Sequence, residues 1–348
     1  MTARIALAAC SLLVAHGCAQ SDTKSSPAPS TGDGVLEVPE VVCPSGTDLQ
    51  TRTSSTGTET YCVRTLPQNP NVDVGPPRIQ TGPSVTRFPG GKASAFGEYA
   101  DGFKTGTWHY FHLDGTRLAE GRYDAKGGRV GVWNEWRSGG KLRTEATYVD
   151  ARLEGPWRNV WGERVVGEGA FKEGLPSGTW TSHFCTGGVH ETVTLAEGKL
   201  DGPCSRFEAT GRKYLDGAYR NGKKSGVWRQ SFSNGVHFES SWADDARDGL
   251  FRWFTADGKV TMEGSLRSGK LDGRWVMRDA AGDVGKEGFY EDGQLARGTD
   301  VTNELKLNGY ESNAYCAYNL QGFTPLPSTG GPAAGADPDL TTVVCDRF

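Results

Sequence analysis

Long apolar runs are missing from this sequence once its first 20 residues are passed. No later stretch approaches the roughly 20 apolar residues that a membrane-spanning helix needs, so no such helix is expected. Hydrophobic residues fill only 36% of the 348 positions, whereas glycine alone fills 49. So few apolar side chains and so many glycines favour short strands and turns over a compact helical core.

An excess of positive charge is also missing, because the formal net charge is −4. Nucleic acids and anionic lipid surfaces attract basic proteins. We therefore expect no nucleic-acid partner.

Motifs for catalysis and metal binding are absent from the sequence as well. It contains neither a Gly-x-Ser-x-Gly elbow nor a Cys-x-x-Cys pair. His109 and His112 lie on one expected strand at an odd spacing, so their side chains should point to opposite faces. The sequence therefore predicts no catalytic residues, no metal site and no cofactor.

The N-terminus carries a pattern typical of export. Arg4 precedes an apolar run, Ile5–Ala15, of the length found in signal peptides. The run ends in Val14-Ala15-His16-Gly17-Cys18, which resembles a bacterial lipobox, where cleavage leaves an acylated cysteine. We predict a lipoprotein signal peptide over residues 1–18 with lipid on Cys18; ordinary secretion that discards Cys18 is the alternative. Ala19 replaces the aspartate of inner-membrane retention, which by resemblance to enterobacterial sorting favours the outer membrane.

Six cysteines remain after Cys18. An even number of cysteines in an exported chain predicts disulfides. Proximity in the sequence suggests the pairs 43–62, 185–204 and 316–345, although six cysteines allow about 15 connectivities. The candidates are Cys43, Cys62, Cys185, Cys204, Cys316 and Cys345.

Composition divides the chain into segments. Residues 19–41, rich in Ser, Pro, Thr and Gly in their first part, are expected to form a flexible tether, and residues 67–83 a Pro-rich linker. Between them, residues 42–66 are expected to form a disulfide-closed hairpin. A repeat array is expected over residues 84–298, and a C-terminal cap with a disulfide over residues 299–348.

The array is visible as a motif of glycine, one variable residue and a large apolar residue. It occurs eight times, and successive glycines are 23 to 25 residues apart, which indicates a repeat architecture. The eight copies begin at Gly106, Gly131, Gly155, Gly178, Gly202, Gly226, Gly249 and Gly273.

Two turn signals divide each copy. Asp114-Gly115 and Asp257-Gly258 exemplify the first turn, and Asp101-Gly102 and Asn221-Gly222 the second. Such pairs supply the positive φ of tight hairpin turns. This leaves two strands of about five or six residues per copy. The sequence thus predicts an all-β fold, an elongated single-layer array of stacked antiparallel β-hairpins.

The spacing Tyr-x-x-Gly-x-x-x-Gly-x-Trp, clearest in Tyr99–Trp108 and Tyr219–Trp228, resembles MORN repeats, specifically an antitoxin-like variant. The resemblance covers residues 88–298. It implies stacked hairpins in a twisted sheet, and an antitoxin-like or immunity-like role.

All ten tryptophans lie between Trp108 and Trp275. The large residue of each motif recurs in register, which favours packing between neighbouring copies as a core. The expected core residues are Trp108, Trp133, Trp157, Trp180, Trp228, Phe251 and Trp275. The tryptophans outside this register, Trp136, Trp161, Trp242 and Trp253, are the candidates for an exposed binding surface.

Together these features predict a non-enzymatic envelope lipoprotein that binds or scaffolds an unidentified protein partner, with lipid as its only membrane contact. A structural spacer of the envelope is the first alternative. A carbohydrate-binding protein or glycan-active enzyme is the second, because paired carboxylates can come from distant strands.

Overall fold

The computed structural model describes residues 36–68, 76–137 and 142–307. The chain divides into two units, Met1–Glu37 and Val38–Phe348, and every element below belongs to the second. The predicted signal peptide with Cys18, most of the tether, and Cys316 and Cys345 lie outside the described residues.

The described residues form 21 strands and one short helix. The first eleven strands are β1 (Asp48–Ser54), β2 (Gly57–Thr65), β3 (Arg78–Arg87), β4 (Ala93–Ala100), β5 (Phe103–Phe111), β6 (Arg117–Tyr123), β7 (Arg129–Trp136), β8 (Leu142–Val149), β9 (Arg152–Trp161), β10 (Arg164–Lys172) and β11 (Leu175–His183). The remaining elements are β12 (Val189–Ala196), β13 (Lys199–Phe207), β14 (Lys213–Arg220), β15 (Lys223–Ser231), β16 (His237–Ala243), β17 (Ala246–Phe254), β18 (Val260–Arg267), β19 (Lys270–Arg278), β20 (Val284–Glu291), β21 (Gln294–Gly298) and α1 (Thr302–Leu307).

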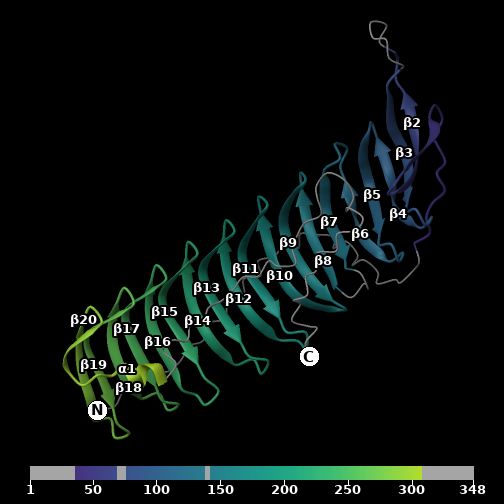
Figure 1. Ribbon diagram of the computed structural model, residues 1–348. Coiled ribbons are helices and arrows are strands. Elements are labelled where there is room, and N and C mark those ends of the chain that lie inside the picture. The colour runs from purple at the N-terminus through teal and green to yellow at the C-terminus, as the bar shows by residue number, and fades with distance from the viewer. Residues whose placement is uncertain (1–35, 69–75, 138–141, 308–348) are drawn as a thin grey trace, which may run out of the picture. The chain divides into compact units, whose positions relative to one another are not determined.

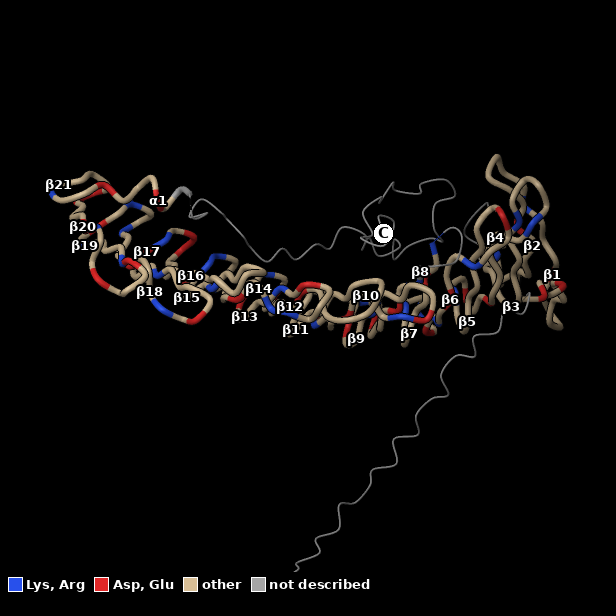
Figure 2. Tube along the Cα trace, turned by 90° about the horizontal axis from the view of Figure 1, so that it is seen from below, with Lys and Arg blue, Asp and Glu red and all other residues tan. Residues whose placement is uncertain are grey.

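Each strand pairs in antiparallel fashion with the next strand in the chain, so all of them form one open sheet in sequence order (Figure 1). Viewed along the strands, they stand in a single row (Figure 2). The predicted array of antiparallel hairpins is therefore confirmed. No helix of the described residues is long and apolar enough to cross a membrane.

The hairpin turns have the chemistry that was predicted. Asp101 and Asn221 have φ values of 49° and 51°, and the glycines that follow them have 84° and 83°. Two successive residues with positive φ match the right-handed twist of the flanking strands, which explains the Asp-Gly and Asn-Gly pairs.

The strands are longer than the predicted five or six residues, since those before β21 contain 7 to 10. The reason lies in the glycine of each Gly-x-Trp motif, which sits inside a strand and not at its end. All eight of these glycines have positive φ, from 64° to 123°. They form β-bulges: Glu120 pairs with Asn134, but Arg122 already pairs with Val130.

The bulges position the tryptophans of the core against the preceding strand. A Cβ added to Gly121 would lie 2.2 Å from Trp133, and one on Gly264 would lie 2.1 Å from Trp275, so these indoles rest directly on the backbone of a glycine in the preceding strand. Trp157 lies over Ala146 instead. The indoles of Trp108, Trp133, Trp228 and Trp275 also donate a hydrogen bond to the next carbonyl oxygen, for example Trp133 Nε1 to Arg122 at 3.1 Å and Trp275 Nε1 to Ser265 at 3.0 Å. The indoles therefore occupy one face of the sheet, which we call the aromatic face.

The expected core residues are buried there. Trp108, Trp133, Trp275 and Phe251 are at most 1% exposed, and Trp157, Trp180 and Trp228 are also buried. Indoles of neighbouring hairpins also approach one another, as the 5.1 Å between the ring centroids of Trp157 and Trp180 shows. The prediction that consecutive copies bury each other's aromatic rings is confirmed.

The N-terminal part of the sheet differs from the prediction. The linker expected over residues 67–83 ends earlier, because β3 already begins at Arg78 and pairs with both β2 and β4. The hairpin β1–β2 is thus continuous with the array. It carries the predicted disulfide Cys43–Cys62.

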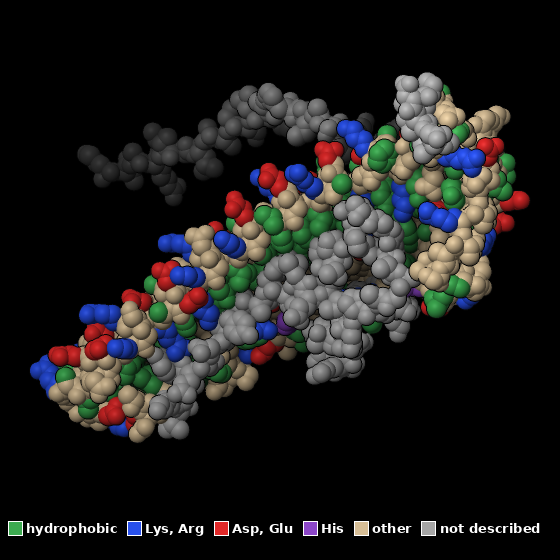
Figure 3. All heavy atoms as spheres, turned by 45° about the horizontal axis from the view of Figure 1, so that its top comes forward, with side chains coloured by type: hydrophobic (Ala, Val, Ile, Leu, Met, Phe, Trp, Pro, Cys, Tyr) green, Lys and Arg blue, Asp and Glu red, His purple; other side chains and the backbone are tan. Residues whose placement is uncertain are grey.

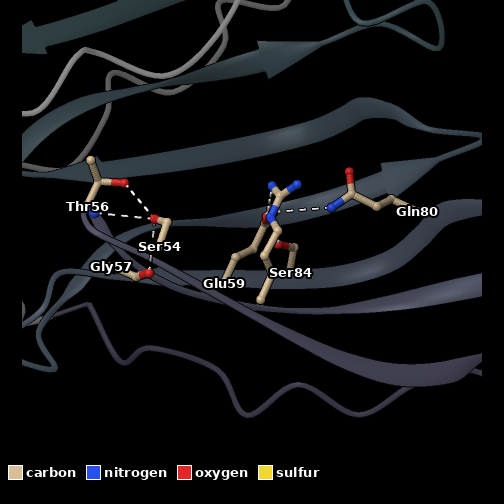
Figure 4. A network of polar contacts seen from close by, with 7 residues as sticks. Ser54, Thr56, Gly57, Glu59, Gln80 and Ser84 are labelled. Atoms are coloured by element: carbon tan, nitrogen blue, oxygen red, sulfur yellow. Dashed lines mark hydrogen bonds and ion pairs between the residues drawn. The ribbon is translucent and has the colours of Figure 1, made fainter.

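A polar network joins the first three strands (Figure 4). Glu59 accepts hydrogen bonds from Gln80 Nε2 at 3.2 Å and from Ser84 Oγ at 3.4 Å, and it pairs with Arg52 at 2.7 Å. Ser84 is buried. The Glu59 carboxylate therefore holds buried polar groups in these first three strands, which carry no tryptophan.

At the other end, the described part of the cap packs onto the sheet. Val301 and Leu305 join the cluster that contains Phe251 and Trp275. Tyr290 Oη donates to Asp300 at 2.8 Å and accepts from the backbone N–H of Val301 at 2.8 Å. Val301 and Leu305 therefore cover the apolar end of this core cluster.

The register of the sheet argues against the suggested disulfide between Cys185 and Cys204. Trp180, Val193 and Cys204 are aligned across β11, β12 and β13, so Cys204 lies about 10 Å from Trp180. Cys185 lies beyond the end of β11 at His183, and His183 is already about 10 Å farther along the strand than Trp180. A disulfide needs Cα atoms within about 7 Å. Cys43–Cys62 is the one disulfide in which both cysteines belong to the described residues.

Candidate interaction surface

The face opposite the indoles carries a second repeated set of residues. Neighbouring residues of a strand point to opposite faces, so the variable residue of each Gly-x-Trp motif points away from the aromatic face. All eight are exposed. This outward row consists of Thr107, Val132, Pro156, Thr179, Pro203, Val227, Leu250 and Arg274.

Most of the outward row is apolar. Val132 is 56% exposed, Val227 59% and Leu250 39%. Equivalent positions recur every second strand, which spaces them about 10 Å apart. The bulge places each side chain at its apex, because the preceding glycine bends the strand there. The outward row is therefore a regularly spaced set of exposed, mostly apolar side chains and the candidate contact surface.

The apolar residues Val132, Val227 and Leu250 of the outward row have small, polar neighbours on the paired strand. Val132 pairs with Thr147, Val227 with Ser241 and Leu250 with Ser265. Directly paired residues share a face, so the apolar side chains stand above a background of short hydroxyl residues. A flat partner can therefore reach the row without steric obstruction from long side chains at these positions.

The charge distribution of the described sheet does not favour a nucleic acid or an acidic surface as the partner. Basic and acidic side chains alternate along the sheet in Figures 2 and 3. Several are paired between successive turns, as Lys270 is with Asp292 at 2.7 Å and Lys223 with Asp244 at 3.7 Å. The electrostatics of the described sheet are locally balanced.

The four tryptophans predicted to form a binding surface are half-buried instead of exposed. Trp242 and Trp253 pack against the core clusters. The indole of Trp242 donates to Ser240 Oγ at 2.7 Å. We therefore assign the contact surface to the outward row and not to Trp242 or Trp253.

Trp136 and Trp161 lie at the ends of β7 and β9. The Arg117 guanidinium is 5.9 Å from the ring centre of Trp136, and the Trp136 carbonyl lies 2.9 Å from Nε2 of His112. These contacts place Trp136 in the packing between hairpins. The sequence did contain a signal for the outward row, since five of its eight residues are Val, Pro or Leu.

Buried cations belong to the aromatic face. Lys104 Nζ lies 4.4 Å from the ring centre of Trp108 and 2.9 Å from Tyr110 Oη. Lys224 Nζ lies 4.5 Å from Trp228 and 4.3 Å from Trp242. Burial lowers the pKa of both lysines to about 8, and for Lys224 the nearby Arg247 guanidinium adds to this effect.

The histidines do not converge on one point. His109 Nδ1 faces Glu120 at 3.3 Å, whereas His183 Nε2 faces Glu168 at 3.5 Å. Within residues 36–68, 76–137 and 142–307, no three or more His, Cys, Asp or Glu side chains gather as metal ligands would.

The fold and this surface define the class of protein as an open-sheet β-hairpin repeat protein. No protein-family model matches the chain, and no curated protein matches it. Among solved structures, a porin-like protein from Bacteroides uniformis shows 9% sequence identity over 72% of this chain and 91% of that chain. Its TM-score is 0.13, too low to carry an argument about fold or function.

Proposed function

We propose that this protein is a non-enzymatic component of the bacterial envelope that binds a protein partner along the outward row. The observation that carries the proposal is the exposure of Val132, Val227 and Leu250 at equivalent positions of different hairpins. Folding does not require apolar residues there, because the aromatic face supplies the core. A role in contact with another molecule accounts for them.

The chemistry of the row fits a protein better than a glycan or a nucleic acid. Glycans are bound in concave sites with convergent polar groups, and nucleic acids by basic surfaces. The outward row is mostly apolar and periodic, and it contains a single charged residue, Arg274. An extended protein segment or a second β-surface can match apolar points about 10 Å apart.

Export and anchoring are part of the same proposal. The disulfide Cys43–Cys62 supports an oxidising compartment. The lipobox-like sequence supports a lipid on Cys18. Fatty-acid labelling should mark the wild-type protein and not the Cys18→Ala variant; a label that persists in the variant would contradict the anchor.

The binding role can be tested with the full-length protein, purified in detergent and used to capture partners from envelope extracts. The triple variant Val132→Asp, Val227→Asp, Leu250→Asp places charges on the outward row and leaves the core intact. We expect the wild type to recover one stoichiometric protein and the variant to lose it.

A matched control carries three equivalent changes at exposed apolar residues outside the row: Leu113→Asp, Val149→Asp and Leu175→Asp. This control should retain the partner. If the outward-row variant retains it too, the surface assignment is wrong. If the wild type captures no protein at stoichiometric yield, a spacer role replaces the binding role.

A further inference from the structure

The open sheet ends in two edge strands, and these two edges differ. β1 lies at one end of the row of strands and β21 at the other (Figure 2). Among the described residues, β1 pairs only with β2 and β21 only with β20. Every second residue of an edge strand directs its backbone N–H and C=O groups away from the sheet, where a strand of another molecule can pair with them.

The β21 edge is poorly suited to such pairing. The strand has only five residues, Gln294–Gly298, and its pairing with β20 shifts in register between Phe289 and Tyr290. Its last residue, Gly298, has a φ of 90°, which departs from extended geometry. Short length and an irregular register are features by which natural proteins block edge-to-edge pairing.

The β1 edge is longer and regular. All seven of its residues, Asp48–Ser54, pair with β2 without a shift in register. The strand contains no proline, glycine or lysine, the residues that commonly interrupt or protect an edge.

The residues that precede β1 lie over other strands. Cys43 is bonded to Cys62 of β2, and the ring of Pro44 lies 3.0 Å from the position of a Cβ on Gly82 of β3. These two residues therefore lie over β2 and β3 and not along the outer edge of β1.

Three side chains of β1 can contact a further strand. Asp48 is exposed, and no basic side chain within residues 36–68, 76–137 and 142–307 forms an ion pair with it. Leu49 is 54% exposed. Arg52 pairs with Glu59 at 2.7 Å, but its side chain is 70% exposed, so its remaining N–H groups can bind a second carboxylate.

A second copy of β1 supplies the complementary groups. Identical strands that pair in antiparallel fashion are related by a two-fold axis, and directly opposed residues direct their backbone groups alike. Because that direction alternates along a strand, the two residue numbers of a direct pair are both even or both odd. The axis therefore passes through a residue position and not between two positions.

Charge selects the position of the axis. With the axis at Gln50, Asp48 of each copy lies opposite Arg52 of the second copy, so two ion pairs form. With the axis at Thr51, Asp48 faces Ser54 instead, and with the axis at Arg52 two arginines meet. Opposite charges in directly opposed positions stabilise a strand pair, and like charges destabilise it.

We propose that this protein forms a dimer in which β1 pairs with β1 of a second copy, antiparallel and with the two-fold axis at Gln50. The same register places Leu49 opposite Thr51 of the second copy and makes the two leucines diagonal neighbours on one face. The contact uses the same strand of both copies, so it closes at two copies. This inference does not depend on the outward row or on its partner.

The variant Gln50→Cys tests the axis on the full-length protein in detergent. Directly opposed Cα atoms lie about 4.5–5.5 Å apart, a distance that a disulfide spans. Mild oxidation should convert most of this variant into a covalent dimer on a gel without reducing agent, and the wild type gives the background from the native cysteines.

The control is Thr51→Cys. In the proposed register the two copies of residue 51 are diagonal neighbours about 7–8 Å apart, too far for a disulfide. Cross-linking of Thr51→Cys as efficient as that of Gln50→Cys, or cross-linking of neither above the background, would overturn the proposed pairing. Cross-linking of Gln50→Cys to a different protein would overturn the dimer in favour of another partner at this edge.

Reversal of one charge tests the ion pairs. Asp48→Arg places arginine opposite arginine at two positions, so the dissociation constant of the dimer should rise by about tenfold or more. Glu163→Arg makes the same change in charge at an exposed turn between β9 and β10 and should leave the dimer intact. Sedimentation equilibrium, corrected for bound detergent, measures both, and circular dichroism checks that both variants are folded. A monomeric wild type, or Asp48→Arg that dimerises like the wild type, would overturn the proposal.

Discussion

The seat of each tryptophan leads to a quantitative prediction for Gly264→Ala. The new Cβ would lie 2.1 Å from Trp275 Cδ2, whereas ordinary contacts begin at 3.4 Å. The indole would have to retreat by about 1.3 Å, yet Trp275 is 0% exposed and its ring centroid lies 5.8 Å from that of Phe251. Backbone strain is not involved, because Gly264 is not in the left-handed region.

The expected cost has two parts. Overpacking a closed core costs about 1–3 kcal/mol. Displacing the indole also breaks its 3.0 Å hydrogen bond to the Ser265 carbonyl, which adds about 1 kcal/mol. Alanine restricts the unfolded chain and returns about 0.4–1 kcal/mol. We expect Gly264→Ala to lower the free energy of unfolding by about 3 kcal/mol at the upper end of these ranges.

Urea denaturation, together with hydrogen exchange of the amides of β18 and β19, measures this loss. Gly285→Ala is the control, because its Cβ would meet the Met277 carbonyl oxygen at 3.8 Å, an ordinary contact. It should change stability by no more than about 0.5 kcal/mol.

The variant Trp275→Leu isolates the steric cause. With the indole gone, Gly264→Ala should cost much less, so the two changes should be strongly non-additive. Additive effects, or a Gly264→Ala variant as stable as Gly285→Ala, would refute the seating of indole on glycine.

Three further predictions concern other parts of the sheet. NMR titration of the lysine ε-carbons should give midpoints near pH 8 for Lys104 and Lys224, in place of the ordinary 10.5. Because the folded state releases these protons at lower pH than the unfolded chain does, the free energy of unfolding should rise between about pH 8 and pH 10.5. Two midpoints at 10.5 would contradict the burial of these lysines. Replacing Cys43 and Cys62 by serine should destabilise the β1–β2 hairpin by about 3 kcal/mol, seen as faster hydrogen exchange there than in β15. Ala151 has a φ of 64°, so Ala151→Gly should raise the free energy of unfolding in urea by about 1 kcal/mol, and a decrease would contradict strain at this turn.

The sequence predicted the order of the strands because each turn is coded locally. Asp101-Gly102 and Asn221-Gly222 supply positive φ within two residues, and a regular interval between such turns leaves hairpins as the simplest solution. The core positions followed from the same regularity. Trp108 and Trp275 are both buried because equivalent residues of a repeat have equivalent neighbours.

The bulges were harder to predict, because a glycine with positive φ looks the same in a turn and inside a strand. Gly106 marked the beginning of a repeat copy, whereas β5 starts at Phe103 and Gly106 lies inside it. The linker before the array was misjudged for a related reason. Residues 78–83 contain few large apolar side chains, but their pairing with β2 and β4 makes them a strand.

The matching of side-chain volumes between neighbouring strands could not be predicted from single copies of the repeat either. Where Phe251 replaces the indole, the residue beneath it is Ser240 and not glycine, and where Cys204 replaces it, that residue is Val193. The smaller the upper side chain, the larger the lower one can be. This compensation was present in the sequence but becomes visible only when the register is known.

The same matching defines the unit by which such a sheet can change length. Gly97 and Trp108 lie in one hairpin, as do Val193 and Cys204, so each hairpin carries both the large or substituted residue of its motif and the residue that lies beneath it. Duplication or loss of about 24 residues, cut at the turns between hairpins, preserves every fit. A cut that separates a glycine from its tryptophan would bring mismatched volumes together, so the array can grow or shrink only in whole hairpins.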